Sequence, residues 1–301
     1  MSDRTFPKPN LLLIGMPRCA STALSVALGK HPDVFVCQPK EPHFLAMHGF
    51  EREMQGPGTA EFDRERRLGP DRWSRLFEGR SERYLVDASV TTATYPEISI
   101  PNIERFCEPD VKIVVMLRNP VERAYSSYMY CVARGWVSGS FEQCLDAERQ
   151  RIADNWQHLW FLTHLGRYRE RLEPFYDAFP EKNIHVMVSE EFSIDPEAAM
   201  SALYEFLDIV PAEIDASARL NSGGKPRNTL VRGLSTLVHA QPLLRQGVRL
   251  LTTRGFRESL RSRHLVKIDM ADDTRASLER SFADTREWVQ GRLGRQLPGW
   301  Q

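Results

Sequence analysis

Residues Leu11–Lys30 constrain the fold more than any other stretch of this chain, because they combine a short apolar run, a tight turn and a helix. The apolar run Leu11–Ile14 has the length of a buried strand, and Gly15 ends it. Ala23–Leu28 continues as a helix, whose first N–H groups lack partners within the helix and point into the turn. The turn lets backbone N–H groups approach a ligand because its residues are small or stiff, namely Pro17, Cys19, Ala20, Ser21 and Thr22. The stretch predicts a phosphate-binding strand–turn–helix unit.

This turn differs from the loop of nucleoside triphosphatases, which reads G-x-x-x-x-G-K-[ST] and puts a lysine directly before the hydroxyl residue. Ser21 occupies that lysine position here, and the cation Arg18 stands three residues earlier. A phosphotransferase of that type also needs a carboxylate after an apolar strand to hold Mg²⁺. The apolar run Lys112–Leu117 is followed by Arg118 instead. A P-loop kinase-like phosphotransferase acting on a small hydroxyl substrate therefore stays only as an alternative.

Short apolar runs alternate with helical patterns along the chain, which predicts an α/β fold with a central parallel sheet flanked by helices. The runs are Leu11–Ile14, Val34–Val36, Tyr84–Val86, Lys112–Leu117 and Ile184–Val188. The helical patterns are Val121–Arg134, Phe141–Ile152, Leu159–Phe179 and a helix that begins at Asp195. With 301 residues, 42% of them hydrophobic, the chain can form one domain spanning residues 1–301. Residues 46–80, rich in charge, glycine and proline, are predicted to be a lid or acceptor loop.

Composition narrows the class of protein. The formal net charge is zero, so the chain as a whole lacks the basic balance of a nucleic-acid-binding protein. Its five cysteines are odd in number and form no C-x-x-C pair, which indicates reduced thiols in the cytoplasm. The sequence contains no H-E-x-x-H motif or Cys/His cluster, so we expect no metal ion. We find no signal peptide and no long apolar run, and we expect a soluble protein.

Charge is nevertheless uneven along the chain. Residues 225–267 contain ten lysines or arginines and a single acid, Glu258. Within the basic helical segment 232–267, leucines and valines interleave with arginines, a pattern compatible with contact to an anionic membrane surface. A solvated helical face packed on the domain explains the same pattern. A non-catalytic, membrane-associated nucleotide-binding module is thus a second alternative, and oligomeric state is not readable from the sequence.

Three further segments place polar residues where a ligand would bind in a parallel sheet, at the carboxyl ends of strands. Arg118 ends the run Lys112–Leu117, and Ser126 lies off the apolar stripe of the following helix, a pair suited to a phosphate monoester. The turn at 39–44 carries Lys40, Glu41 and His43, a group that can take a proton from a hydroxyl. Two glycines then precede a basic loop that can close over an anion, with Lys225, Arg227 and Asn228.

Taken together, these segments resemble the sulfotransferases that use 3′-phosphoadenosine 5′-phosphosulfate (PAPS), especially the carbohydrate, heparan-sulfate-type branch and its bacterial relatives. The family's first turn reads G-x-x-[KR]-x-[GA]-[ST]-[ST], and residues 15–22 read G-M-P-R-C-A-S-T. Its strand-end motif, L-R-[DN]-P-x-x-R-x-x-S-x-Y, is matched in full by residues 117–128. Its turn P-K-E-x-H-F is matched by residues 39–44, and its late nucleotide-binding loop resembles residues 224–228. The resemblance spans nearly the whole chain.

The resemblance implies an O-sulfotransferase that moves the sulfuryl group of PAPS to a hydroxyl of a glycan, glycolipid or glycosylated metabolite by in-line transfer, without a metal. It implies Glu41 as the general base, with His43 as the alternative base and with Arg18 and Lys40 as cations near the transferred group. Donor binding is implied for Pro17, Arg18, Cys19, Ala20, Ser21, Thr22, Arg118, Ser126, Lys225, Arg227 and Asn228. The family's E-K-[ST] segment has its counterpart at Asp87–Ser89, without the lysine, which argues against heparan itself as the acceptor.

Overall fold

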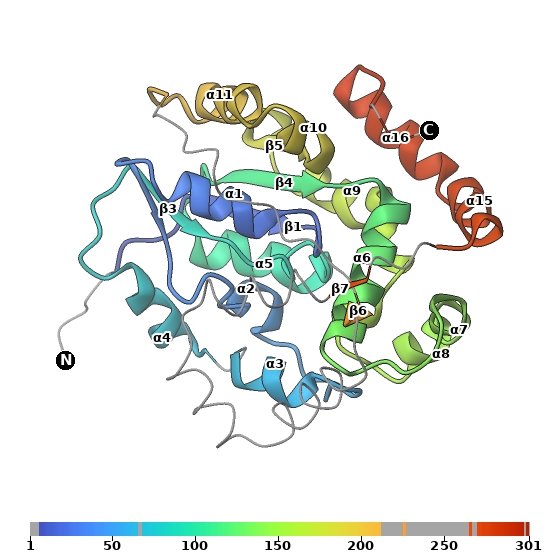
Figure 1. Cartoon of the computed structure of the whole chain (residues 1–301). Coiled ribbons are helices and arrows are strands. Elements are labelled where there is room, and N and C mark those ends of the chain that lie inside the picture. Colours follow the sequence, from blue (N-terminus) through green and yellow to red (C-terminus); the bar gives the residue numbers. More distant parts are fainter. Residues whose placement is uncertain are drawn as a thin grey trace.

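The computed structural model describes residues 6–65, 68–211, 225–226, 265–266, 270–297 and 299–300. Its centre is a five-stranded, all-parallel sheet with helices packed around it (Figure 1). The strand order is β2-β3-β1-β4-β5. The strands are β1 (Leu11–Gly15), β2 (Val34–Val36), β3 (Tyr84–Asp87), β4 (Lys112–Leu117) and β5 (Ile184–Val188). The predicted α/β fold class is confirmed, and each predicted strand lies within a residue of its expected bounds.

The order of the strands determines where a ligand can bind. After β1 the chain runs to β2 and β3 on one side of the sheet, and after β4 it runs to β5 on the other side. The connections that follow β1 and β4 therefore leave in opposite directions and open a crevice between their carboxyl ends, the usual ligand site of such sheets. The two strands pair directly, with Leu11 opposite Lys112 and a register shift between Leu13 and Gly15. Both predicted phosphate-binding segments begin at this crevice.

Helices fill the connections between the strands. Those between β1 and β4 are α1 (Ser21–Leu28), α2 (Phe44–Met47), α3 (Thr59–Glu65), α4 (Pro70–Ser74), the 3-10 turn η1 (Arg75–Phe77) and α5 (Pro96–Phe106). Those between β4 and β5 are α6 (Pro120–Ala133), α7 (Phe141–Asp146), α8 (Glu148–Ala153), η2 (His158–Trp160), η3 (His164–Gly166), α9 (Tyr168–Ala178) and η4 (Glu181–Asn183). After β5 follow α10 (Ser189–Ile194), α11 (Pro196–Leu207), the antiparallel pair β6 (Lys225–Pro226) and β7 (Leu265–Val266), α15 (Asp272–Ser281) and α16 (Ala283–Leu293).

The predicted helix over residues 159–179 is wrong in its first half, where two 3-10 turns precede α9. Side chains take the backbone groups that a helix would pair internally. The guanidinium of Arg123 donates to the carbonyls of Phe161 and Leu162. The buried carboxylate of Glu148 accepts from the N–H groups of Thr163 and His164. The predicted helix over 141–152 is likewise divided, because α7 ends at Asp146 and α8 begins at Glu148.

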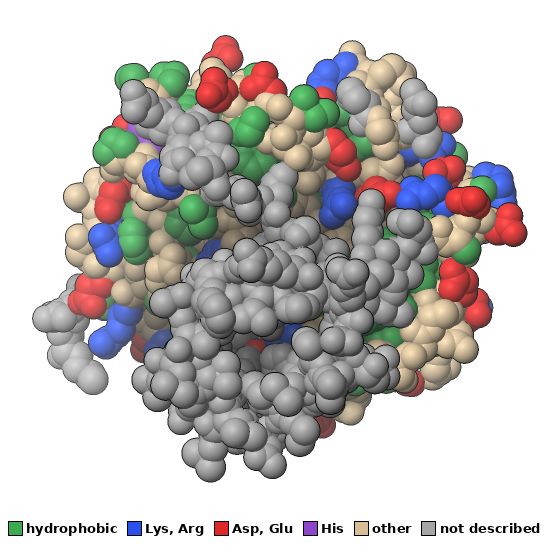
Figure 2. All heavy atoms as spheres, viewed as in Figure 1, with side chains coloured by type: hydrophobic (Ala, Val, Ile, Leu, Met, Phe, Trp, Pro, Cys, Tyr) green, Lys and Arg blue, Asp and Glu red, His purple; other side chains and the backbone are tan. Residues whose placement is uncertain are grey.

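The core lies on both faces of the sheet, as expected for parallel strands that read as continuous apolar runs. Every residue of β1 is buried, and so are Ile113 to Leu117 of β4. On the face shown in Figure 2, acidic and basic side chains are interspersed over the coloured surface, in keeping with the zero net charge. All five cysteines are buried free thiols. Among the described residues, the helices are too short or too polar to cross a membrane.

Gly15 shows how tightly the end of β1 is packed. A Cβ atom at this position would lie 2.9 Å from the Cβ of Ala93, closer than real contacts allow. Ala93 is itself held in place because its N–H donates to the carbonyl of Ile14 at 2.9 Å. The loop that follows β3 therefore presses on the start of the donor turn, and only glycine fits there.

We expect Gly15→Ala to lower the free energy of unfolding by about 1–3 kcal/mol, the usual cost of overpacking. Ala93→Gly in the same protein removes the methyl group that clashes and is expected to recover most of this loss. Urea unfolding of the wild type, both single variants and the double variant measures the coupling. An equal cost of Gly15→Ala in both backgrounds would show that the close approach to Ala93 is not the reason for glycine.

Candidate active site

The turn after β1 exposes backbone N–H groups at the start of α1. Arg18 and Ala20 both adopt left-handed backbone conformations, with φ of 73° and 65°. α1 then begins at Ser21, two residues earlier than the sequence predicts, and Ala20 at its N-cap supplies no side-chain acceptor. The N–H groups of the first turn are therefore left without a side-chain cap and carry the positive end of the helix dipole. Burial raises the pKa of the Cys19 thiol to about 12, so this residue packs as a neutral group.

The junction between β4 and α6 is fixed by Asn119. Its side-chain oxygen accepts hydrogen bonds from the N–H groups of Val121 at 2.9 Å and Glu122 at 3.4 Å, which caps α6. Its side-chain nitrogen donates to the carbonyl of Gly299 at 2.6 Å. The carbonyl of neighbouring Arg118 accepts a hydrogen bond from the Tyr168 hydroxyl at 2.6 Å. These hydrogen bonds hold both the backbone of Arg118 and the start of α6. Arg118 directly follows the last residue of β4, as predicted.

The structure brings the two junctions into contact. Nε of Arg18 lies 3.4 Å from Oγ of Ser126, and Nη1 of Arg118 lies 3.4 Å from the carbonyl oxygen of Arg18. Burial lowers the pKa of Arg18, and the neighbouring charge of Arg118 lowers it further. Two cations held this close in a partly buried site favour an anion between or beside them. Three predicted donor-site residues from separate parts of the sequence therefore meet.

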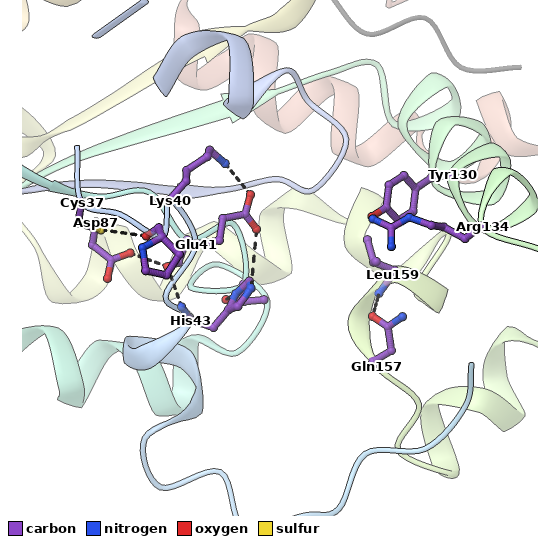
Figure 3. A network of polar contacts seen from close by, with 12 residues as sticks. Cys37, Lys40, Glu41, His43, Asp87, Tyr130, Arg134, Gln157 and Leu159 are labelled. Carbon is purple, nitrogen blue, oxygen red and sulfur yellow. Dashed lines mark hydrogen bonds and ion pairs between the residues drawn. The ribbon is translucent and has the colours of Figure 1, made fainter. Parts of the chain in front are cut away.

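The turn that follows β2 carries Lys40, Glu41 and His43 together (Figure 3). Nζ of Lys40 lies 2.5 Å from Oε1 of Glu41, and Nε2 of His43 lies 4.0 Å from Oε2. Nδ1 of His43 is 2.9 Å from Oγ1 of Thr91. The Glu41 side chain is 30% exposed, whereas that of His43 is 4% exposed. Glu41 is therefore the most exposed side chain of the trio, Lys40 is partly exposed, and His43 is buried.

A buried polar chain ties this turn to β3. The carboxylate of Asp87 accepts from the Trp73 indole N–H at 2.8 Å and from the Ser89 hydroxyl at 2.5 Å. Ser89 Oγ in turn accepts from the backbone N–H of His43 at 3.1 Å. Burial raises the pKa of Asp87 to about 6. The acidic segment at 87–89 thus has a positioning role, since it contacts the backbone of the turn that bears Glu41.

A second wall lies across from this turn in Figure 3 and comes from α6 and residues 155–160. Here Arg134 donates to Glu61 of α3 at 2.8 Å, and Gln55 N donates to the carbonyl of Asn155 at 2.9 Å. The left-handed Gly56 and Gly58 lie against the indoles of Trp156 and Trp136, where a Cβ atom would clash. Trp160 and Phe161 are core residues. Residues 55–61 therefore pack against this wall.

Comparison with known proteins decides the family. A model of the Sulfotransferase family matches residues 9–212, which is more than half of the chain. The chain belongs to the sulfotransferase family. Carbohydrate sulfotransferase 15 of Rattus norvegicus is 22% identical over 250 residues, covering 67% of this chain and 44% of that protein. Heparan sulfate glucosamine 3-O-sulfotransferase 3B1 of Mus musculus is 26% identical over 201 residues, covering 67% of this chain and 46% of that protein.

This family member thus spans less than half the length of these curated relatives. The crystal structure of a sulfotransferase from Alicyclobacillus acidocaldarius is similar over most of its length, with a TM-score of 0.77 and 26% identity. That likeness covers 97% of this chain and 98% of the other. The family predicted from the motifs at 15–22, 39–44 and 117–128 is confirmed, and all three motifs lie within the matched residues.

Some predicted site residues lie outside the described structure. They are Arg227, Asn228, the side chain of Lys225 and the basic segment 232–267 apart from strand β7. Sequence analysis missed Tyr130, whose ring contacts Arg18, and Arg134, which contacts the same ring. The spacing between Ser126 and Tyr130 could have indicated the first, because residues four apart share one face of a helix. Over the described residues, no three His, Cys, Asp or Glu side chains group as metal ligands would.

Two neutral imidazoles, those of His43 and His158, lie close to the Glu41 side chain. The rings of His43 and His158 are 6.4 Å apart, and each packs against Phe62. Burial lowers the pKa of His43 to about 3, helped by the charge of Lys40. Burial also lowers the pKa of His158 to about 3, and its Nδ1 has no hydrogen-bond partner in the described structure. His158 is thus a packed histidine that borders the site.

These shifts predict acid sensitivity. Between pH 6.5 and about 3, His158 is protonated in the unfolded chain but neutral in the folded protein, so the free energy of unfolding falls as the pH falls. Asp87 acts in the opposite direction between pH 3.8 and about 6, because the folded protein then holds the extra proton. We expect His158→Phe to reduce the slope near pH 5 by about 1.4 kcal/mol per pH unit relative to wild type. Urea unfolding of the wild type and the variant at a series of pH values measures this slope.

The control for this comparison is the same pair of proteins above pH 7, where His158 is neutral in both states and the difference between them is expected to stay constant. Parallel curves for the wild type and the variant from pH 4 to 6.5 would mean that His158 takes up a proton in the folded protein as readily as in the unfolded chain.

Proposed function

We propose that this protein transfers the sulfuryl group of PAPS to a hydroxyl group of a sugar or of a glycosylated or lipid-linked metabolite. The observation that carries the proposal is the meeting of Arg18, Ser126 and Arg118 at the crevice between β1 and β4. Family membership supports sulfuryl transfer over the kinase-like alternative. PAPS is the donor substrate, and its product is adenosine 3′,5′-bisphosphate (PAP).

The donor fits the charges and hydrogen-bond donors of the crevice. The uncapped N–H groups at Ser21 and Thr22, with the guanidinium of Arg18, suit the 5′-phosphosulfate. Arg118 and Ser126 suit the 3′-phosphate, because a forked donor and a short hydroxyl can share one phosphate group. Pro17, Cys19 and Ala20 shape the turn. Lys225, Arg227 and Asn228 stay predicted contacts of the same nucleotide.

Glu41 is the proposed general base. The acceptor oxygen forms a bond to sulfur while the bond between sulfur and the phosphate oxygen of PAPS breaks, and the hydroxyl proton passes to the Glu41 carboxylate. Lys40, 2.5 Å from Glu41, orients the carboxylate and adds positive charge near the transferred group. Arg18 and the loop N–H groups stabilise the charge that develops on the leaving phosphate. His43, with its pKa lowered to about 3, is the weaker candidate for the base.

The relatives support a carbohydrate acceptor, since one is a carbohydrate sulfotransferase and the other a heparan sulfate glucosamine 3-O-sulfotransferase. Glu41 opens toward the wall that carries Tyr130, Arg134 and residues 155–160, and residues 46–65 border the same region. We therefore propose that the acceptor enters between the 39–44 turn and this wall, with 46–80 as the acceptor loop. A cytoplasmic location, and membrane contact through 232–267, remain proposals from the sequence.

Glu41→Gln tests the base. The change removes the proton acceptor but keeps the size of the side chain, so we expect turnover to fall by about 10²-fold or more while PAP affinity changes little. Transfer of labelled sulfate from PAPS to a panel of glycans and glycosylated metabolites gives turnover, and calorimetry gives PAP affinity. Glu104→Gln, the same change at an exposed acid on α5 and outside the proposed site, is the matched control. Turnover close to that of wild type would remove Glu41 from the role of base.

Arg118→Ala tests the 3′-phosphate contact. We expect PAP affinity to fall by about 30-fold to several hundred-fold, the result of losing about 2–4 kcal/mol from a charged hydrogen bond. The affinity for AMP, which has no 3′-phosphate, should change far less. Calorimetry with both nucleotides measures the difference, and Arg169→Ala on the exposed side of α9 is the control. A wild-type protein that binds PAP no better than AMP would contradict the proposed donor.

A further inference from the structure

We propose that Tyr130 is a positioning residue for Arg18, the cation of the donor turn, and so helps to bind the phosphosulfate end of the donor. The proposal rests on the function proposed above and adds a residue that none of the family motifs quoted above contains. Tyr130 lies on α6, one helical turn after Ser126, and its ring faces the guanidinium of Arg18 across the crevice. The role is one of orientation, because the ring acts on the donor through Arg18.

Two side chains of α6 hold the same guanidinium. Cζ of Arg18 lies 4.6 Å from the centre of the Tyr130 ring, within the range of a cation–π contact. Nε of Arg18 lies 3.4 Å from Oγ of Ser126. Within the described part of the chain, this is the only hydrogen bond of the guanidinium, so both Nη atoms are left for a ligand. The ring and the hydroxyl together restrict the side chain to one direction.

An arginine at this position needs such a restraint. Its backbone is left-handed, with φ of 73°, and its long side chain loses rotamer freedom when it binds a ligand. A planar guanidinium stacks on an aromatic ring, whereas the compact ammonium of lysine carries its charge on a flexible stem. Stacking on Tyr130 therefore orders Arg18 before the donor arrives. This gives a physical reason for arginine rather than lysine at this position of the turn at 15–22.

Tyr130 is itself fixed from the other side. Its hydroxyl accepts a hydrogen bond from Arg134 at 2.5 Å, and Cζ of Arg134 lies 4.8 Å from the ring centre. Arg134 also donates to Glu61 of α3 at 2.8 Å and lies over the indole of Trp136. Figure 3 shows Tyr130 and Arg134 on α6, across from the turn with Lys40 and Glu41. The ring thus has little freedom to turn away from Arg18.

A double-mutant cycle in the full chain tests the proposal, with PAP as the probe and calorimetry at fixed salt as the measurement. We expect Tyr130→Leu to weaken PAP binding about 5- to 10-fold, in the range of one cation–π contact. In an Arg18→Ala protein, the same Tyr130→Leu change should weaken binding less than about twofold, since the ring then has nothing to orient. Tyr130→Phe keeps the ring and should restore affinity to within about twofold of wild type.

Tyr125→Leu is the matched control. It makes the same chemical change on the same helix, at a ring that packs against Phe141 and Tyr128 instead of Arg18, and should leave PAP affinity unchanged. Urea unfolding of each variant separates loss of fold from loss of affinity. An equal effect of Tyr130→Leu with and without Arg18 would overturn the proposal while leaving the donor assignment intact. Failure of the wild type to prefer PAP over AMP would instead overturn the proposed function, and this inference with it.

Discussion

The parallel pairing of β1 with β4 is the constraint on which the rest of the structure depends. Because strand order reverses at this pair, the turn after β1 and the helix start after β4 open onto one crevice. Arg18 and Ser126 are more than a hundred positions apart, yet they contact each other for this reason alone. The tight packing of Gly15 on Ala93 fixes the position of the turn after β1. The cap by Asn119 fixes the start of α6 after β4.

The sequence predicted the parts of the fold that follow from local patterns. The five apolar runs became strands, and Asp195 became a helix cap, since such signals act within a few residues. The failures lie where side chains distant in sequence take over backbone groups. Arg123 and Glu148 pair with residues 161–164 and replace a helix by two 3-10 turns. No periodicity within residues 159–167 can reveal partners that stand on other helices.

The same distinction applies to the site. Motifs identified Arg18, Glu41 and Arg118, because each stands in a short run of residues whose chemistry points to phosphate or proton transfer. They did not identify what holds these groups. Ser89 contacts the Glu41 turn at the backbone N–H of His43, and Asp87 acts on the turn through Ser89. Tyr130 contacts Arg18 through its ring. Such supporting contacts depend on how β3 and α6 are placed in space, which only the folded chain defines.

The clustering of arginines at the crevice also has an energetic cost. Burial lowers the pKa of Arg18 and of the fully buried Arg123, and the neighbouring charge of Arg118 lowers both further. None of the three pairs with a carboxylate among the described residues, and Nε and Nη1 of Arg123 have no hydrogen-bond partner there. Clustered, unpaired cations of this kind oppose folding. A nucleotide with a phosphosulfate at one end and a 3′-phosphate at the other would supply the missing anions, and the relief of this repulsion would add to the affinity for the donor.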